Sequence, residues 1–297
     1  MMRVVVALGG NALLRRGERP DAATQRRNVA TAIAAIAPIA RRHQVVITHG
    51  NGPQIGLLAQ RSDRPDPLDI LGAETEGAIG YMIEVELGNQ LRDRDVAAIL
   101  TCVEVDPGDP AFAVPDKPVG PLFSESEARQ LAAKRDWSVA REKAGWRRVV
   151  PSPQPKRIRD IRAIKLLLDG GVLVICAGGG GIPVAVGEDG SIHGIEAVID
   201  KDRASALLAE ELAADVLLLL TDEPGVWPLW PRREGVPLSR VSPAELGGIA
   251  FEPGTMGPKA RAAGRFVERT GRTAGIGAIE DAEKILAGER GTIVSPA

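Results

Sequence analysis

The amino-acid sequence predicts an α/β protein in which helices cover both faces of a mainly parallel central sheet, a three-layer αβα sandwich. Short continuous apolar runs alternate with segments of helical periodicity, and most of these runs stop at a glycine-rich turn. Prolines accumulate over residues 106–155 and break the alternation, which predicts a small protruding subdomain there. We therefore expect a single domain over residues 1–297 with an inserted subdomain at 106–155.

The first expected strand is Arg3–Leu8, a short, valine-rich run that ends at Gly9-Gly10-Asn11. A little further on, Pro53 fits the first turn of a helix, where its missing N–H is not needed. The other elements expected in this part are a helix over 22–42 that Pro38 disturbs, a strand over 45–48, a helix over 68–94 and a strand over 97–105.

Residues 172–220 predict a parallel βαβ unit. Two apolar runs, 172–176 and 216–220, are typical of buried parallel strands, and the periodic run 204–214 is typical of the crossover helix. The other elements expected in the second half are helices over 124–134, 160–168 and 256–268, strands over 273–279 and 292–294, and a hairpin that turns at 188–191 between strands 184–186 and 194–198.

The composition narrows the possible functions. The chain is 44% hydrophobic and 26% charged, an ordinary globular composition, and its net charge of -2 predicts no attraction to nucleic acid or to a membrane. No apolar run approaches the roughly 18 residues of a membrane span, and the first strand is too short for a signal peptide. Cys102 and Cys176 lie in strand-like runs, as reduced core thiols do, so we expect a cytoplasmic protein. The three histidines show no metal-ligand spacing, so no metal site is expected.

Glycine-rich loops follow four of the expected strands. Glycines can serve only to make tight turns, but four such loops at one sheet edge favour phosphate binding by backbone N–H groups. The P-loop, dinucleotide-binding and protein-kinase motifs are absent. The loops are 9–11, 50–54, 178–181 and 221–225.

Two lysines stand at the beginnings of expected helices in a chain with only eight lysines, which makes each of them informative. Lys201 and Lys259 could flank a phosphoryl group that is being transferred, although either alone could be a solvated surface residue. Asp202 could orient the two ammonium groups, cap the helix, or do both. The run 147–165 holds seven basic residues and one acid, which predicts either a solvated basic face or a surface that steers anions.

Seven motifs, in order along nearly the whole chain, closely resemble those of carbamate kinases, members of the amino-acid kinase fold. HGNGPQ, VVPSPQP and the proline-rich insertion are specific to that branch. The motifs are ALGGNAL (7–13), THGNGPQIG (48–56), DPAFAVPDKPVGP (109–121), RRVVPSPQPKRI (147–158), CAGGGGIPV (176–184), GIEAVIDKDRASALLAEELAAD (194–215) and PGTMGPKARAA (253–263).

The resemblance implies reversible phosphoryl transfer between ATP and carbamate, which gives carbamoyl phosphate and ADP. It implies Mg²⁺ carried by the nucleotide phosphates, a homodimer, a mobile lid formed by the insertion, and use of the reaction to make ATP in arginine breakdown. Carbamate is already an anionic oxygen nucleophile, so no general base is needed, in agreement with the lack of a Ser/His/Asp arrangement.

The resemblance also assigns roles to individual residues. The phosphoryl group would be stabilised by Lys201 and Lys259, with Asp202 organising them and Lys117 reaching in from the insertion. Carbamate and the transferring phosphate would be held by Gly9, Gly10, Asn11, Gly50, Asn51 and Gly52. The nucleotide would be held by Gly178, Gly179, Thr221, Asp222, Gly225, Val226, Trp227, Met256 and Gly257.

The chain departs from the family pattern in three places. The usual TDVDGVY is Thr-Asp-Glu-Pro-Gly-Val-Trp here, so Glu223-Pro224 alters the nucleotide loop. Residues 139–146 lack the usual glycine- and arginine-rich segment, and Ala7 stands where related kinases carry a lysine, which makes Lys117 its substitute. Two alternatives stay open: another amino-acid kinase acting on a small carboxylate or phosphonate, and a catalytically silent nucleotide or metabolite sensor.

Overall fold

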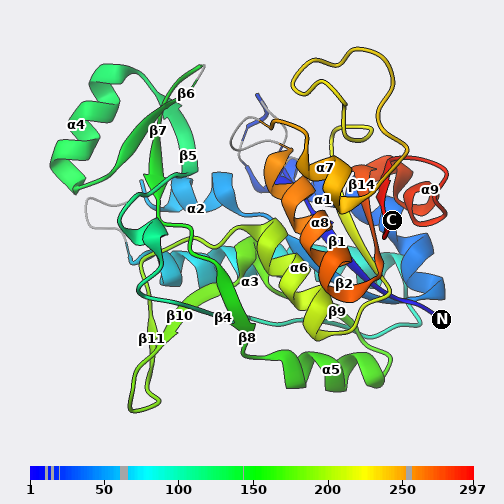
Figure 1. Cartoon of the computed structure of the whole chain (residues 1–297). Helices are drawn as coiled ribbons and strands as arrows, with labels where there is room; N and C mark the ends of the chain where they lie inside the picture. Colours follow the sequence, from blue (N-terminus) through cyan, green and yellow to red (C-terminus); the bar gives the residue numbers. More distant parts are fainter. Residues whose placement is uncertain (11–12, 15–16, 20, 61–65, 143, 252–255) are drawn as a thin grey trace.

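The computed structural model describes residues 1–10, 13–14, 17–19, 21–60, 66–142, 144–251 and 256–297 (Figure 1). Its largest sheet has eight strands in the order β13-β15-β14-β12-β1-β2-β9-β3, and all its pairings are parallel except that of β14 with β15. The strands are β1 Arg3–Leu8, β2 Gln44–His49, β3 Val96–Ala98, β9 Leu173–Ile175, β12 Val216–Thr221, β13 Arg240–Val241, β14 Thr273–Ala278 and β15 Thr292–Val294.

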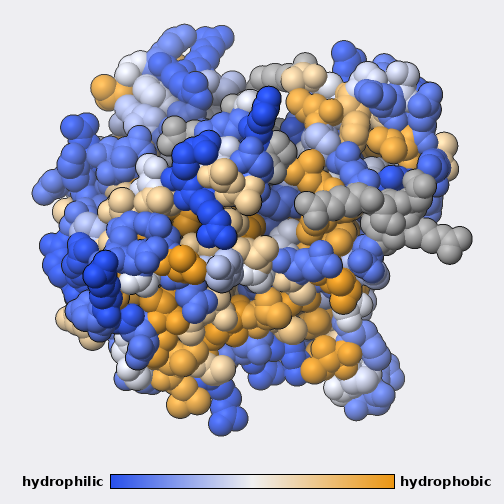
Figure 2. Space-filling model, turned by 180° about the vertical axis from the view of Figure 1, so that it is seen from behind, coloured by the Kyte–Doolittle hydropathy of each residue, from blue (hydrophilic) through white to orange (hydrophobic). Residues whose placement is uncertain are grey.

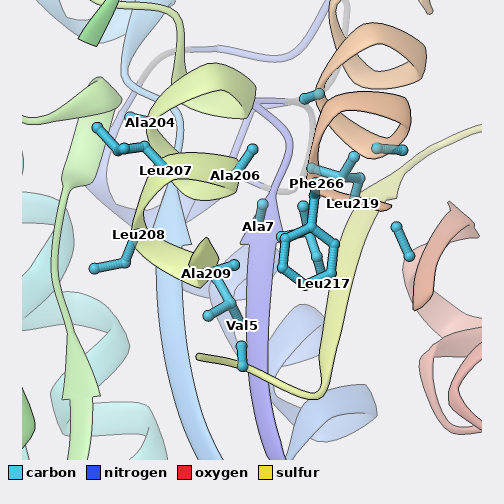
Figure 3. Close-up of a cluster of buried hydrophobic side chains, with 14 of the residues drawn as sticks. Val5, Ala7, Ala204, Ala206, Leu207, Leu208, Ala209, Leu217, Leu219 and Phe266 are labelled. Atoms are coloured by element: carbon cyan, nitrogen blue, oxygen red, sulfur yellow. The ribbon is translucent and has the colours of Figure 1, made fainter. Parts of the chain in front are cut away.

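Helices cover both faces of this sheet, which confirms the expected layers. Side chains of β1 alternate between the faces: Val4 and Val6 pack in one core with α1 and α3, whereas Val5 and Ala7 pack in the other with α6 and α8. Figure 3 shows Phe266 of α8 beside Leu217 and Leu219 of β12. These helices are α1 Ala22–Arg42, α3 Leu68–Gln90, α6 Lys201–Glu211 and α8 Gly257–Thr270.

The expected strand over 97–105 is in fact two strands in different sheets. β3 ends at Ala98, and β4 Cys102–Val105 belongs to a four-stranded sheet in the order β11-β10-β4-β8. The chain leaves the main sheet between them, because Thr101 donates its N–H to the Glu76 carboxylate and Cys102 donates its N–H to Asp160. Side chains distant in sequence therefore take over the backbone bonds that a continuous strand would have made.

The hairpin prediction was wrong for its second strand. β10 Ile182–Val186 pairs with β11 Ile192–Gly194, not with residues 194–198. The segment after Gly194 instead crosses the beginning of α3, where Glu196 accepts the Leu68 N–H at 2.8 Å. The helix expected over 68–94 also ends earlier, at Gln90.

Part of the proline-rich insertion forms its own small sheet, in the order β5-β7-β6, with α4 beside it. Figure 1 shows this part standing apart from the main sheet, at the upper left. We call β5, α4, β6 and β7 together the β5–β7 unit. Their bounds are β5 Lys117–Phe123, α4 Glu125–Arg135, β6 Val139–Glu142 and β7 Gly145–Val150.

The remaining elements are short. In the part of the chain that the structure describes, no helix is both long and apolar enough to cross a membrane, and Cys102 and Cys176 are free thiols. The elements are α2 Gly52–Leu58, β8 Pro155–Ile158, α5 Ile161–Asp169, α7 Pro243–Gly247, α9 Ala282–Leu286, η2 Pro110–Phe112, η3 Gly178–Gly180 and η4 Ile279–Asp281.

Candidate active site

The four glycine loops meet at the carboxyl ends of four neighbouring strands, β12, β1, β2 and β9. Leu8 is paired with Leu220 on one side and with His49 on the other, so the loops after these residues start side by side. This edge is where ligands bind in open parallel sheets. The sequence-based expectation that the loops converge is therefore confirmed by the sheet register.

Lys201, Asp202 and Lys259 form one buried ion-paired group, which we call the lysine centre. Lys201 Nζ donates to Asp202 Oδ1 at 2.6 Å, and Lys259 Nζ donates to Asp202 Oδ2 at 3.2 Å. The Asp202 side chain is 5% exposed and the two lysine side chains 10% and 12%. The three residues come from the first turns of α6 and α8, which pack on the same face of the sheet.

Opposing effects set the pKa values in this centre. Burial lowers the pKa of Lys201, and the charge of Lys259 adds to this effect although Asp202 opposes it. Burial also disfavours the charged form of Lys259, but Asp202 outweighs burial and raises the pKa of Lys259. Burial likewise opposes the ionisation of Asp202, yet the two lysines lower its pKa. The shared carboxylate is therefore held as an anion, and it keeps two cations close together.

Hydrogen bonds fix the beginning of α6, which carries Lys201 and Asp202. Asp200 caps the helix by accepting the N–H groups of Asp202 and Arg203 at 3.0 and 3.2 Å. One turn later, the Ser205 hydroxyl donates to the Lys201 carbonyl at 2.7 Å and lies 2.7 Å from the Thr48 hydroxyl of β2. This first turn is thus tied directly to a central strand.

Lys117 of the β5–β7 unit also reaches this edge, but it pairs with a different acid. Its Nζ donates to Asp200 Oδ2 at 2.9 Å, with both side chains partly exposed. Burial opposes ionisation of Asp200, but Lys117 and Lys201 lower its pKa. The Asp200 carboxylate therefore serves two purposes, since one oxygen caps α6 and the other holds Lys117.

The β5–β7 unit docks against α2 through two glycines. A Cβ on Gly56 would lie only 2.0 Å from the Gly120 Cα, and Gly120 itself has a φ of +76°. Neither position accepts a side chain in this arrangement. A small apolar cluster surrounds the contact, and it includes Ile55, Val119 and Val150.

The tetraglycine loop at 178–181 is packed so tightly that none of its four residues could carry a side chain. A Cβ on Gly178 would lie 2.3 Å from His49 Nε2, and one on Gly179 would lie 2.1 Å from Asn51 Nδ2. The Gly178 N–H already donates to Glu76 Oε1 at 2.8 Å. In this structure that amide is therefore occupied by a protein carboxylate.

Glu76 and His49 are two buried titratable residues below this loop that our sequence reasoning missed. Glu76 accepts the N–H groups of Gly178 and Thr101, and burial raises its pKa to about 8. Burial lowers the pKa of His49 to about 4, and its Nε2 has no hydrogen-bond partner among the residues that the structure describes. The burial of the Glu76 carboxyl group could not be anticipated, because in the sequence Glu76 is simply one of several acids on a long helix.

The residues assigned to carbamate lie directly after β1 and β2, at the same edge of the sheet. Gly9 and Gly50 donate their N–H groups to the carbonyls of Leu220 and Leu8, each at 3.1 Å, and so extend the sheet by one step. Asn51 is buried and donates to the Thr75 hydroxyl at 2.9 Å. Gly10 packs beside Gly50, and Gly52 begins α2, whereas Asn11 lies outside the described residues.

The residues assigned to the nucleotide follow β12 and precede α8. Thr221 ends β12, and its hydroxyl donates to the exposed Asp222 at 3.0 Å. The charge of Asp222 contributes to the raised pKa of Lys259, which connects this loop electrostatically to the lysine centre. The remaining members are buried or partly buried: Gly225, Val226, Trp227, Met256 and Gly257.

The basic run at 147–165 is not a bare positive face. Four of its side chains pair with acids on other segments at 3.1–3.5 Å, which weakens the case for steering of anions. Within the described ranges, no group of three or more His, Cys, Asp or Glu side chains could hold a metal ion.

Comparisons with known proteins agree with this arrangement. The Amino acid kinase family matches residues 2–277. A carbamate kinase from Rhizobium meliloti is 53% identical over 302 aligned residues, which cover 99% of this chain and 93% of that protein. A crystal structure from Aeropyrum pernix K1 matches with a TM-score of 0.92 at 40% identity, over 99% of this chain and 100% of the other. Carbamate kinase from Giardia lamblia bound to AMP-PNP matches with a TM-score of 0.88 at 38% identity, over 100% of this chain and 99% of the other.

Proposed function

This chain belongs to the amino acid kinase family and, within it, to the carbamate kinases, and from that premise we propose that it transfers a phosphoryl group reversibly between ATP and carbamate. The observation that carries the proposal is the lysine centre: two lysines share one buried carboxylate at the carboxyl edge of the sheet, beside glycine loops. The products would be ADP and carbamoyl phosphate.

The chemistry requires positioning and charge stabilisation rather than proton transfer. An anionic oxygen of carbamate attacks the γ-phosphorus, the bond from that phosphorus to the bridging oxygen breaks, and ADP leaves with the bond electrons. Each lysine ammonium has three N–H donors and uses one on Asp202, so the others are available to the phosphoryl oxygens. Because Asp202 is buried and paired, the donors are in place before the substrate arrives.

The surrounding loops would hold the two substrates on either side of the lysine centre. We assign carbamate and the transferring phosphate to Gly9, Gly10, Asn11, Gly50, Asn51 and Gly52. The nucleotide then lies toward the loop after β12 and the beginning of α8, that is toward Thr221, Asp222, Gly225, Val226, Trp227, Met256 and Gly257. Gly178 and Gly179, which the sequence also assigns to the nucleotide, follow β9 on the other side of β1 and β2, and the Gly178 N–H is bonded to Glu76. Mg²⁺ would arrive on the nucleotide phosphates and neutralise part of their charge.

The β5–β7 unit would act as a lid, within an inserted subdomain that spans residues 106–155 of a single domain. Its docking brings Lys117 to Asp200, the residue directly before Lys201. An ammonium group shifted from Asp200 to the substrate would add a third positive charge at the reacting phosphate. This step requires the Lys117–Asp200 ion pair to open when the substrate binds.

In a homodimer, the two subunits would contact each other through the solvent-exposed side of α3. Ile70, Tyr81 and Val85 lie on one side of this helix and are 38–54% exposed, and Leu100 beside it is 53% exposed. α6 and α8 cover the front of the sheet in Figure 1, and Figure 2 shows hydrophobic residues gathered in the lower part of the opposite face. Exposed apolar residues that lie on one side of a helix are typical of subunit contacts. The homodimer would work in the cytoplasm and make ATP in arginine breakdown.

The proposal is tested by the formation of ATP from ADP and carbamoyl phosphate in the presence of Mg²⁺. Folded protein should produce ATP, and in the reverse assay it should consume ATP with carbamate but not with acetate, aspartate, glutamate or small phosphonates. Conversion of one of those other compounds would indicate a different amino-acid kinase. Nucleotide binding without any turnover would contradict the assignment as an enzyme and favour a sensor.

A further inference from the structure

The loop between β12 and β13 begins at the lysine centre and leads away from it. A Cβ on Gly9 would lie 3.8 Å from the Thr221 Cα, and Asp222 influences the pKa of Lys259. Figure 1 shows this loop as the long yellow segment at the upper right. A nucleotide whose terminal phosphate lies at the lysine centre can therefore extend along the beginning of this loop.

The base of the loop is closed by Thr292 of β15. The Thr292 hydroxyl accepts the Val226 N–H at 2.8 Å and donates to the Leu238 carbonyl at 2.6 Å. Leu238 also donates its N–H to the Val226 carbonyl at 2.8 Å. Residues 227–237 thus form a closed loop whose two ends are fixed to the main sheet.

Glu223 lies just before this closed loop and makes two contacts within it. Its Oε2 accepts the indole N–H of Trp227 at 3.3 Å, and its Oε1 is paired with the guanidinium of Arg233. The Glu223 side chain is only 12% exposed, whereas that of Arg233 is 64% exposed. A largely buried carboxylate therefore connects the loop to the strand end that begins it.

We propose that Glu223 is a positioning residue for the nucleotide, because it fixes the Trp227 indole in the orientation that a purine ring stacks against. The inference rests on the proposed function, since Trp227 was assigned to the nucleotide end on that basis. It goes further by giving a role to Glu223, at the position where this chain departs from TDVDGVY.

The contact between Glu223 and Trp227 predicts an effect on nucleotide binding but little effect on phosphoryl transfer. Glu223→Ala should raise the KM for ADP about 5- to 10-fold, the effect expected when one ordinary hydrogen bond is lost, since the bond from the Trp227 indole to Glu223 is long at 3.3 Å. It should change the KM for carbamoyl phosphate and the kcat by less than about 2-fold, because Glu223 contacts neither carbamoyl phosphate nor the reacting phosphate in this proposal. Arg233→Ala, which removes the exposed partner only, should have the smaller effect on the KM for ADP.

A double-mutant cycle separates positioning from loop stability. Trp227→Phe keeps an aromatic ring but removes the indole N–H, so Glu223→Ala should have little further effect in that background. If Glu223 only stabilised the loop, the two substitutions would add, and the KM values of both substrates would rise. Additive effects of the two substitutions would overturn the inference, and so would a rise in the KM values of both substrates. An unchanged KM for ADP in a folded Glu223→Ala protein would also overturn it.

Two further measurements keep the inference distinct from the proposed function. Calorimetric titration of ADP onto wild type and Glu223→Ala reports nucleotide affinity even in a protein without turnover, so loss of the reaction would overturn the proposed function alone. If Glu223→Ala does not fold, Glu223→Gln replaces it. The amide oxygen still accepts the Trp227 N–H but the charge facing Arg233 is lost, so the Kd for ADP should match that of Arg233→Ala, and a larger rise would count against the inference.

Discussion

The lysine centre and the β5–β7 unit both bring ammonium groups to the same edge of the sheet, but they hold them differently. Lys201 and Lys259 stand on helices that pack into the main core, and they share the buried Asp202. Lys117 stands on a separate small sheet and reaches a partly exposed Asp200. The first arrangement is preorganised by the core, whereas the second depends on docking that can be undone without unfolding the protein.

The largest effect should come from the lysine centre. Lys201→Ala removes one of two cations beside the reacting phosphate, and we expect kcat to fall about 100- to 1,000-fold with little change in the Kd for ADP. Lys284→Ala, which removes an exposed lysine paired with Asp281, is the matched control and should retain full activity. Unchanged turnover of Lys201→Ala would show that the centre does not stabilise the phosphoryl group.

Blocking the docking of the β5–β7 unit should have the next largest effect. In Gly56→Ala the new methyl group would occupy the space of the Gly120 backbone, so the unit would shift outward. We expect kcat/KM for carbamoyl phosphate to fall about 10- to 100-fold, since small displacements of positioning groups have effects of this size.

Gly72→Ala is a suitable control for the docking test, because a Cβ there would meet no atom of the described residues within 4 Å. Both variants should melt within a few degrees of the wild type, as the main core is untouched. Equal activity of Gly56→Ala and Gly72→Ala would contradict a closing role of the β5–β7 unit.

Removing the lid lysine itself should have a smaller effect, which falls on binding more than on turnover. Lys117→Ala should raise the KM for carbamoyl phosphate about 10-fold and lower kcat less than Lys201→Ala does. Its free energy of unfolding should change by less than about 1 kcal/mol, because the Lys117–Asp200 pair is partly exposed. Lys156→Ala removes a more exposed ion pair, with Asp106 at the beginning of the insertion, and serves as the control. A KM equal to that of the control would remove Lys117 from the site.

The last prediction concerns the dependence of stability on pH, with no expected loss of activity, and it tests the main body rather than the β5–β7 unit. The pKa of Glu76 is raised to about 8 in the folded protein from 4.5, so the folded state keeps a proton that the unfolded state loses. Stability should therefore fall as pH rises toward 8 and level off above it, by up to about 1.4 kcal/mol per pH unit. His49 has the opposite sign, but its pKa falls from 6.5 to about 4, so it contributes only below pH 6.5.

Urea unfolding between pH 6.5 and 8 isolates Glu76 from His49 in this test. Glu76→Gln should show a flatter profile than the wild type over that window, although its amide group cannot accept both backbone N–H groups and will lower stability at every pH. Parallel profiles for the two proteins would mean that Glu76 is ionised over this whole pH range. The backbone N–H groups of Gly178 and Thr101, which lower the pKa of Glu76, would then outweigh the effect of its burial, which raises it.

The sequence alone predicted most of the architecture that creates the active site. Continuous apolar runs identified β1, β2, β9 and β12, because a strand buried on both faces must be apolar along its whole length. Glycine after each run marked the loops, and Lys201 and Lys259 stood out because lysine is rare in this chain. These features are local, so they are readable from composition and spacing.

Only the tertiary structure decided which groups face one another. The split between β3 and β4 depends on the Glu76 carboxylate, and the end of β11 depends on how the following segment crosses α3. The pairing of Lys117 with Asp200 rather than Asp202 depends on how the β5–β7 unit docks at Gly56. Such contacts join residues far apart in the chain. The sequence by itself therefore determined the strands, the loops and the scarce lysines, whereas burial and long-range hydrogen bonds determined their partners and their pKa values.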